Sequence, residues 1–251
     1  MKPIIMKQTR DLMGMTINVE IADLEAKETD YDIVFSYFES VEKRFSFFRK
    51  DSEISLLNSN KIRRDQLSEE SKTIFALAEE TKSQTNGYFD ILTPEGKYNP
   101  SGIVKGWAIN NASGLLLDKG FKNFYIEAGG DIQANGLNKS GQRWSVGIQN
   151  PFDISHIVKV IYLRDKGIAT SGTYRRGQHI YNPNNPGSIL SDIVSISVIG
   201  PNVYEADRFA TAAFAMGDRG INFIEKLDGF EAYMIDKKGM AVQTSSFERY
   251  L

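Results

Sequence analysis

The chain contains no cysteine, which excludes disulfide bonds, thiolate metal sites and cysteine nucleophiles. It also lacks an excess of charge, because 30 basic and 32 acidic residues leave a net charge of -2. No broad positive field is available to hold a nucleic-acid backbone, so we expect no nucleic-acid partner. Histidine is scarce, with two residues in the chain, and no pair at ligand spacing predicts a zinc site.

Long apolar runs are missing as well. No stretch approaches the length of a membrane span, and the first residues, 1–7, hold only a short apolar run before the next charge. Such a run is far shorter than the core of a signal peptide. The sequence as it stands therefore predicts a cytoplasmic protein, although an exported protein whose signal segment had been removed would have the same sequence.

The chain does have the length and apolar content for one large core, with 251 residues of which 41% are hydrophobic. In its first half, alternation over residues 12–21 predicts a strand. Helical spacing and capping residues then predict helices over residues 29–45, from residue 68 towards 87, and over residues 104–117. Gly120 stands where helices often end.

After Gly120 the pattern changes to short apolar runs separated by turn residues, which is typical of strands. An alanine-rich helix over residues 204–216 interrupts them. Helices and strands do not alternate as in a doubly wound fold, so we predict a single α+β domain over residues 1–251. The predicted strands are residues 124–128, 144–149, 158–163, 168–171 and 195–199, followed by a hairpin of residues 231–235 and 240–244.

One candidate binding segment precedes the third helix. Asn99, Ser101 and Gly102 lie just before it and Lys105 lies in its first turn. Exposed backbone N–H groups and a lysine at such a place suit a phosphate. The alternative is an Asn-Pro turn that only caps the helix, but a cation in a first turn opposes the helix dipole unless an anion offsets it.

A second candidate lies on the alanine-rich helix. Asp207 and Thr211 are four residues apart, so they share one face of the helix. Two oxygen ligands at this spacing can hold a hard cation whose other ligands come from phosphate and water. The alternative is an acidic residue that stabilises the helix start and a buried threonine bonded to the preceding turn.

Three further segments have both a functional and a structural interpretation. The Gly-Gly turn between Glu127 and Asp131 brings backbone close to a ligand, or is simply a tight turn between strands. His179 is a candidate for proton transfer or ligand contact, although a lone histidine is more often structural. The aromatic residues of segments 45–48 and 87–90 can stack on a flavin or adenine ring, or belong to the core.

Taken in order, these segments resemble the ApbE family of FAD:protein FMN transferases. The resemblance runs through most of the chain, and its specificity comes from the order of the motifs. The matching motifs are Met13-Gly-Met-Thr16, Asp51-Ser-Glu-Ile-Ser-Leu-Leu-Asn58, Gly87-Tyr-Phe-Asp90, Ser101-Gly-Ile-Val-Lys-Gly-Trp-Ala108, Ala128-Gly-Gly-Asp131, Trp144-Ser-Val-Gly-Ile148, Ala169-Thr-Ser-Gly-Thr-Tyr174, His179-Ile180 and Ala206-Asp-Arg-Phe-Ala-Thr211.

The resemblance implies an α+β domain with a large, mostly antiparallel or mixed sheet flanked by helices, and a cleft that holds FAD with its diphosphate on a magnesium ion. Asp207 and Thr211 match the family's side-chain metal ligands, and Gly102 matches the position that gives a backbone carbonyl. The positions that match the lining of the FAD site are Met13, Phe48, Tyr88, Phe89, Asp90, Asn99, Lys105, His179 and Ile180.

The implied reaction takes place at the FAD pyrophosphate. A threonine hydroxyl of a flavin-acceptor protein attacks the FMN phosphorus and AMP leaves, while magnesium and Lys105 neutralise charge. His179 is the candidate that accepts the hydroxyl proton. The catalytic residues implied are thus His179, Asp207 and Lys105. If water attacks instead, the same site is an FAD pyrophosphatase that gives FMN and AMP.

The chain departs from the family pattern at two acids. Asn99 stands where the family commonly has Asp, and Asn182 replaces the usual Asp after the His-Ile pair. An amide keeps hydrogen bonding but cannot act as a base. The segment between Asp90 and Asn99 is also short. These changes favour an alternative in which the protein binds FAD without transferring FMN.

Overall fold

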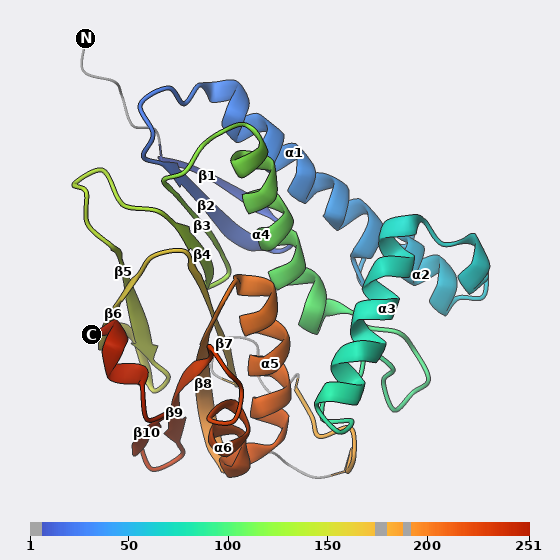
Figure 1. Cartoon of the computed structure of the whole chain (residues 1–251). Helices are drawn as coiled ribbons and strands as arrows, with labels where there is room; N and C mark the ends of the chain where they lie inside the picture. The colour runs from blue at the N-terminus through green and yellow to red at the C-terminus, as the bar shows by residue number, and fades with distance from the viewer. Residues whose placement is uncertain (1–6, 174–179, 188–191) are drawn as a thin grey trace.

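A computed structural model describes residues 7–173, 180–187 and 192–251, and its centre is one large antiparallel sheet (Figure 1). The sheet has eight strands in the order β1-β2-β3-β4-β7-β8-β9-β10, and the remaining pair, β5 and β6, forms a separate hairpin. Every pairing is antiparallel. The strands are β1 (Lys7–Leu12), β2 (Met15–Ile21), β3 (Phe124–Ala128), β4 (Asp131–Asn135), β5 (Trp144–Asn150), β6 (Asp153–Leu163), β7 (Lys166–Gly172), β8 (Ile193–Gly200), β9 (Glu231–Asp236) and β10 (Ala241–Gln243).

Helices cover one face of this sheet, with α4 and α5 side by side and α1 packed against α4 (Figure 1). Helices α2 and α3 lie outside this layer, on the side away from the sheet. The predicted α+β class with a large antiparallel sheet flanked by helices is therefore confirmed. The helices are α1 (Glu28–Phe45), α2 (Glu53–Asn58), α3 (Glu69–Gln84), α4 (Ser101–Asp118), α5 (Val203–Ala215) and α6 (Gly220–Ile224), with short 3-10 turns at η1 (Arg64–Gln66), η2 (Gly217–Arg219) and η3 (Phe247–Tyr250).

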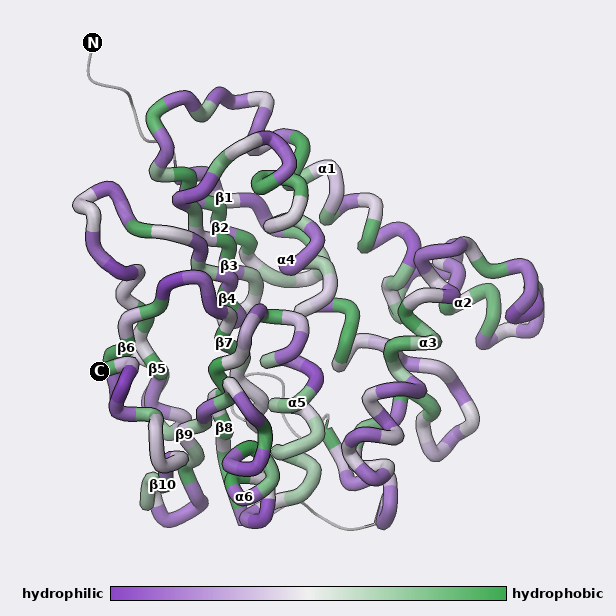
Figure 2. Tube along the Cα trace, viewed as in Figure 1, coloured by the Kyte–Doolittle hydropathy of each residue, from purple (hydrophilic) through white to green (hydrophobic). Residues whose placement is uncertain are grey.

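The apolar positions of these elements explain the layers. Phe35 and Phe38 of α1 and Ile109 of α4 are buried with the apolar side chains of β2 and β3. Helix α5 buries Ala206, Ala210 and Ala213 on β7 and β8, where small side chains let helix and sheet approach closely. The later part of α5 is mostly pale green (Figure 2), which agrees with a helix covered on several sides.

The hairpin of β5 and β6 packs on the other face of the sheet. Trp144 and Ile161 belong to a third cluster that includes Tyr233 and Phe247. The Trp144 indole N–H also donates to the Asn135 carbonyl at 2.9 Å. The hairpin is thus anchored at one end by this tryptophan.

Several elements differ from the sequence prediction. The strand expected over residues 12–21 is interrupted by a tight turn at Met13 and Gly14, whose φ angles are 55° and 70°. The apolar alternation continues through this turn, so it hid the boundary between β1 and β2. Strands β1 and β4 and helices α2 and α6 were not predicted; β1, β4 and α2 are short and carry several polar residues, and α6 is only one turn long. No helix among the described residues is long and apolar enough to cross a bilayer.

Candidate functional site

The candidate site lies where α4 and α5 touch. Asn202 caps α5, accepting from Glu205 N–H at 2.9 Å, and the Val203 N–H donates to Gln133 Oε1 of β4 at 2.9 Å. One turn further along α5, Asp207 Oδ2 accepts the Gly106 N–H of α4 at 2.8 Å. These bonds fix Asp207 against both the sheet and the neighbouring helix.

Gly106 permits this contact because it has no side chain. A Cβ added at Gly106 would lie 2.6 Å from the Asp207 Cβ and 2.8 Å from the Val203 carbonyl oxygen. Either distance is far below van der Waals contact, so any side chain at position 106 forces the two helices apart.

A lysine and two buried carboxylates form the charged centre of the site. Lys105 Nζ lies 2.6 Å from Asp131 Oδ2 and 3.9 Å from Asp207 Oδ1. Asp131 is 1% exposed and Asp207 is 4% exposed. The second oxygen of Asp131 accepts the Thr170 N–H of β7 at 3.1 Å. One ammonium therefore faces two carboxyl groups, and a bound cation would balance the charge of the second one when both are ionised.

The electrostatic surroundings of Asp207 agree with this imbalance. Burial raises the pKa of Asp207 above its ordinary value, the Lys105 ammonium opposes that rise, and the adjacent Asp131 adds to it. The carboxylate form of Asp207 is thus less favourable than in water, and a cation beside it would stabilise that form.

Oxygen donors for such a cation come together at Thr211 and Gly102. The Thr211 Oγ1 lies 3.5 Å from the Gly102 carbonyl oxygen, one helical turn along α5 from Asp207. A carboxylate, a hydroxyl and a backbone carbonyl are the ligand types that a hard cation such as magnesium prefers. The donor set therefore fits the predicted metal, and the two side chains expected from their i, i+4 spacing do share one face.

Helix α2 holds the segment before α4 through two hydrogen bonds. The Asn58 side chain of α2 donates to the Tyr98 carbonyl and accepts the Tyr98 N–H, both at 2.8 Å. Asn99 Oδ1 accepts from Ser101 N–H at 3.2 Å and from Ser101 Oγ at 2.7 Å. The amide at position 99 thus forms a turn with Ser101, the first residue of α4, and Lys105 lies one turn further on.

The aromatic segment 87–90 lies after α3 and splits between core and surface. Phe89 is 2% exposed and packs beside Gly102, whose added Cβ would meet the Phe89 ring at 3.3 Å. The Tyr88 hydroxyl accepts from Arg219 at 2.6 Å. Asp90 pairs with Lys82 at 2.6 Å. Of these three predicted flavin-contacting residues, Phe89 lies against the start of α4.

The segment 180–187 contacts the chain on either side of Tyr88 and Phe89. The Tyr181 hydroxyl donates to the Leu92 carbonyl at 3.2 Å, and Asn184 Nδ2 donates to the Asn86 carbonyl at 3.1 Å. Asn182 Oδ1 accepts the Asn184 N–H at 2.9 Å and shapes the turn. Ile180 packs against the apolar cluster around α5. His179 lies outside the described residues.

Met13 and Phe48 occupy different surroundings. The β2–β3 pairing and the Gly129 N–H bond to the Thr16 carbonyl at 3.3 Å bring the turn at Met13 and the turn before Asp131 to one end of the sheet. Met13 is partly buried there. Phe48 is 93% exposed in the loop between α1 and α2, with its ring 6.0 Å from that of Phe47.

Two residues of the site had no predicted role in it. Asp131 was noticed only as part of a Gly-Gly turn, and Arg208 only as part of a motif. Arg208 is 5% exposed and donates to Glu205, to Thr81 Oγ1 at 3.1 Å and to Gln84 Oε1 at 2.5 Å, so it joins α5 to the end of α3. An arginine within an alanine-rich buried helix was the signal that could have identified this link.

The arrangement as a whole joins an oxygen-rich cation site to a helix start that suits phosphate. Lys105 and the N–H groups at the start of α4 supply positive potential beside Thr211 and Asp207. An anionic group held at Lys105 would lie next to a cation held at Asp207. The site therefore has the chemical features required to bind and polarise a diphosphate.

Comparisons with known proteins identify the family to which the chain is similar. The ApbE family matches residues 13–95 and 93–234. The FAD:protein FMN transferase of Salmonella typhimurium is 30% identical over 153 residues, which are 57% of this chain and 44% of that protein, so the chain covers less than half of that relative. The FAD:protein FMN transferase of Vibrio cholerae is 26% identical over 305 aligned positions, with 95% of this chain and 90% of that protein covered.

Solved structures extend the similarity to the whole fold. The flavin transferase ApbE from Vibrio cholerae superposes with a TM-score of 0.85 at 25% identity, and the alignment covers 98% of this chain and 99% of that one. The ApbE protein of Thermotoga maritima gives a TM-score of 0.87 at 18% identity, with 98% and 99% covered. At this lower identity the second comparison shows the fold alone.

Proposed function

The chain belongs to the ApbE family, and from this premise we propose that it transfers FMN from FAD to a hydroxyl group of an acceptor protein. The observation that carries the proposal is the position of Lys105 between two buried carboxylates, beside the oxygens of Thr211 and Gly102. FAD is the substrate with a diphosphate to place there, and relatives bear the name FAD:protein FMN transferase.

In the proposed reaction the acceptor residue is a threonine. Its hydroxyl oxygen bonds to the FMN phosphorus, the bond from that phosphorus to the bridging oxygen breaks, and AMP leaves with the bridging oxygen. His179 accepts the hydroxyl proton in this scheme. The product is an acceptor protein that carries FMN through a phosphoester.

Other residues of the chain are assigned to binding the metal, the diphosphate and the flavin. Asp207, Thr211 and the Gly102 carbonyl would hold magnesium, which supplies charge neutralisation at the diphosphate when bound. Lys105 orients the diphosphate and offsets its charge, while Asp131 holds the Lys105 ammonium in place at 2.6 Å. Tyr88, Phe89 and Asp90, together with Met13 and Ile180, line the flavin in this proposal. Phe48 is exposed, so in this proposal it would contact the flavin from the protein surface.

One observation favours a second function. Asn99 Oδ1 already accepts hydrogen bonds from Ser101, and an amide there cannot serve as a base. The second function is therefore binding of FAD without transfer of FMN, for which no base is needed at position 99.

The first experiment incubates the purified protein with FAD, with and without magnesium and with and without a flavin-acceptor protein, and separates FAD, FMN and AMP by chromatography. We expect magnesium-dependent AMP release matched by covalent flavin on the acceptor. AMP with free FMN would instead identify a pyrophosphatase, and intact bound FAD would identify a binding protein.

A substitution at His179 separates chemistry from binding. We expect His179→Ala to slow transfer while FAD affinity stays within about tenfold, a difference of ~1.4 kcal/mol. Complete loss of FAD binding in this variant would instead assign His179 to binding or structure.

A further inference from the structure

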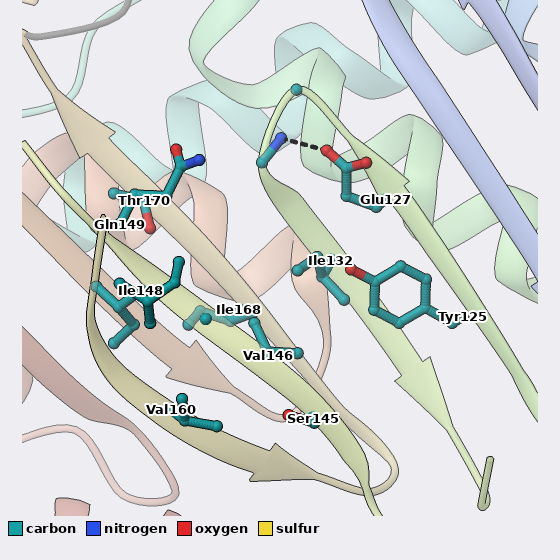
Figure 3. Close-up of a pocket in the computed structure, with 14 residues that line it drawn as sticks. Tyr125, Glu127, Ile132, Ser145, Val146, Ile148, Gln149, Val160, Ile168 and Thr170 are labelled. Atoms are coloured by element: carbon teal, nitrogen blue, oxygen red, sulfur yellow. Dashed lines mark hydrogen bonds between the residues drawn. The ribbon is translucent and has the colours of Figure 1, made fainter. Parts of the chain in front are cut away.

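A cavity of about 420 Å³ lies between the β5–β6 hairpin and strands β3, β4 and β7 (Figure 3). Binding sites for small molecules usually have volumes of about 300–1,000 Å³, so the cavity has room for a free ligand. Much of its wall is aliphatic, with the buried side chains of Ile132 and Ile168 from the sheet and of Val146 and Ile148 from β5. None of the described residues that line the cavity has a role in the proposed FAD site.

The cavity has a negatively charged group in its lining. Among the described residues that line it, Glu127 alone has a formal charge at neutral pH. The Glu127 carboxylate accepts the Gly130 N–H at 2.8 Å and the side-chain N–H of Asn18 at 2.5 Å, and both donors are neutral. No lysine, arginine or histidine of the described chain forms an ion pair with this carboxylate. A positively charged ligand would supply the missing opposite charge.

Tyr125 lies next to Glu127 on the same face of β3, two residues earlier in the strand. Its ring packs against Trp144, with the ring centroids 5.4 Å apart. Burial raises the pKa of Tyr125, and the negative charges of Glu127 and Glu20 raise it further. The Tyr125 hydroxyl therefore keeps its proton, and the same negative potential attracts a cation to this part of the cavity.

The hydrogen-bonding capacity of these two side chains suits an ammonium group. A carboxylate has about four lone-pair sites, and the described residues use two of them at Glu127. The Tyr125 hydroxyl accepts no hydrogen bond from the described residues. An ammonium group carries three N–H donors and no acceptor, so it matches both oxygens. Figure 3 shows Ile132 and Ile168 between Glu127 and Val160, so an aliphatic chain attached to the ammonium would lie along apolar side chains.

We propose that the cavity binds a small organic cation, namely a primary ammonium group on an unbranched aliphatic chain. The ammonium pairs with the Glu127 carboxylate and donates to the Tyr125 hydroxyl, while the chain packs on the aliphatic wall. Burial of the chain supplies affinity, and the charge gives selectivity against alcohols and carboxylates. Binding needs neither FAD nor the proposed transfer reaction.

The first test measures the charge of the ligand. Hexylammonium, hexan-1-ol and hexanoate have the same chain length, and their binding to the protein without FAD is measured by titration calorimetry at neutral pH. We expect hexylammonium to bind at least about tenfold more tightly than hexan-1-ol and hexanoate to bind more weakly than both. Equal affinities for the ammonium and the alcohol would overturn the proposal.

The second test removes the charge from the protein. We expect Glu127→Gln to lower the affinity for hexylammonium at least about tenfold, equivalent to ~1.4 kcal/mol, and to leave that for hexan-1-ol within about twofold. Glu225→Gln is the matched control, because the Glu225 carboxylate also accepts from neutral donors, the N–H and hydroxyl of Ser245, and does not line the cavity. It should change neither affinity. Unchanged hexylammonium binding by Glu127→Gln would overturn the assigned ion pair.

The third test locates the ligand. Val160 lines the cavity and is 44% exposed, so Val160→Trp can fill part of the cavity from its surface side. Val242→Trp is the matched change on β10, at a valine that is 50% exposed and does not line the cavity. We expect Val160→Trp to weaken binding of both hexylammonium and hexan-1-ol at least about tenfold. Val242→Trp should change neither, and wild-type binding by a folded Val160→Trp variant would overturn the site.

The length and the source of the chain are tested with two further ligands. Butylammonium should bind about tenfold more weakly than hexylammonium, because it buries two fewer methylene groups. Nα-acetyllysine methylamide carries the same charge on a peptide backbone and should also bind more weakly. Equal or tighter binding of this lysine derivative would assign the cavity to a lysine side chain of another protein and overturn the assignment to a free amine.

Discussion

Helix α4 has a lysine near each end that pairs with a buried aspartate, and the two ends differ in their charge balance. Past the C-terminal end, Lys119 donates to Asp30 at 2.9 Å, and the Lys27 N–H donates to the other Asp30 oxygen at 2.9 Å. Near the N-terminal end, Lys105 faces both Asp131 and Asp207. Asp30 has one lysine to itself, whereas Asp131 and Asp207 share Lys105.

The pKa values of Asp30 and Asp207 are therefore shifted in opposite directions. Burial alone would raise the pKa of Asp30, but the hydrogen bonds from Lys119 and from the Lys27 N–H outweigh it and lower that pKa. Burial raises the pKa of Asp207, the nearby Asp131 adds to this rise, and the Lys105 ammonium opposes it without cancelling it. A buried carboxyl group with a raised pKa beside another charged group is a candidate for a functional role, which is the role that we propose for Asp207.

The largest expected effect comes from removing the incompletely balanced carboxylate. Asp207→Ala should lower magnesium-dependent AMP release by more than about a hundredfold, because a direct metal ligand matters at least as much as its surrounding shell. Asp118→Ala, at an exposed position at the end of α4, is the matched control and should leave the rate unchanged. Unaltered AMP release by the Asp207 variant would refute the metal assignment.

The contact that brings Asp207 to α4 can be broken without touching a charge. Gly106→Ala should lower the free energy of unfolding by about 1–3 kcal/mol, because its Cβ would lie 2.8 Å from a backbone oxygen. Gly114→Ala in the same helix has nothing within 4 Å of the added Cβ and should stabilise by about 0.5–1 kcal/mol. Urea unfolding of the two variants measures both; equal stabilities would show that the helices separate freely at Gly106.

Changing only the charge at the N-terminal end gives a smaller effect. Asp131→Asn keeps an acceptor for the Thr170 N–H but removes one negative charge from the cluster, which leaves Lys105 to compete with a cation at Asp207. We expect magnesium affinity, measured by calorimetry without FAD, to fall about tenfold. An unchanged affinity, with the fold intact by circular dichroism, would assign Asp131 to structure alone.

The smallest effect is expected at the C-terminal end. Because the folded-state pKa of Asp30 is lowered, its contribution to stability is present above the ordinary aspartate pKa and is lost as the pH falls through the folded-state value. Asp30→Asn should therefore unfold with a weaker dependence on pH in the acid range below about pH 4. Thermal unfolding between pH 2 and pH 7 compares the two proteins, and identical pH profiles would contradict a balanced ion pair.

Local patterns predicted much of the fold and one part of the site. The i, i+4 spacing of Asp207 and Thr211 placed both on one helical face, and the glycine after residue 119 marked a helix end, since both signals lie within a few residues. The order of the motifs supplied the remaining site positions through the family resemblance.

The non-local parts of the site could not be predicted in this way. The pairing of Lys105 with Asp131 joins a helix to a strand from a different part of the chain, and the link from Arg208 to Thr81 joins two helices. The periodicity of apolar residues within an element does not predict which other element it will contact. The turn at Met13 was missed for a different reason, because apolar residues continue on both sides of it.

The order of the strands has a consequence for how the chain folds. Each strand of the large sheet pairs with the next one along the chain once the β5–β6 hairpin is left out. The connections β1–β2, β3–β4 and β9–β10 are tight turns, and β4–β7, β7–β8 and β8–β9 are of intermediate length. The pairing of β2 with β3 is the exception, because α1, α2, α3 and α4 intervene between Ile21 and Phe124. Closing this longest loop costs the most chain entropy, so the β1–β2 hairpin should join the sheet late and set the folding rate.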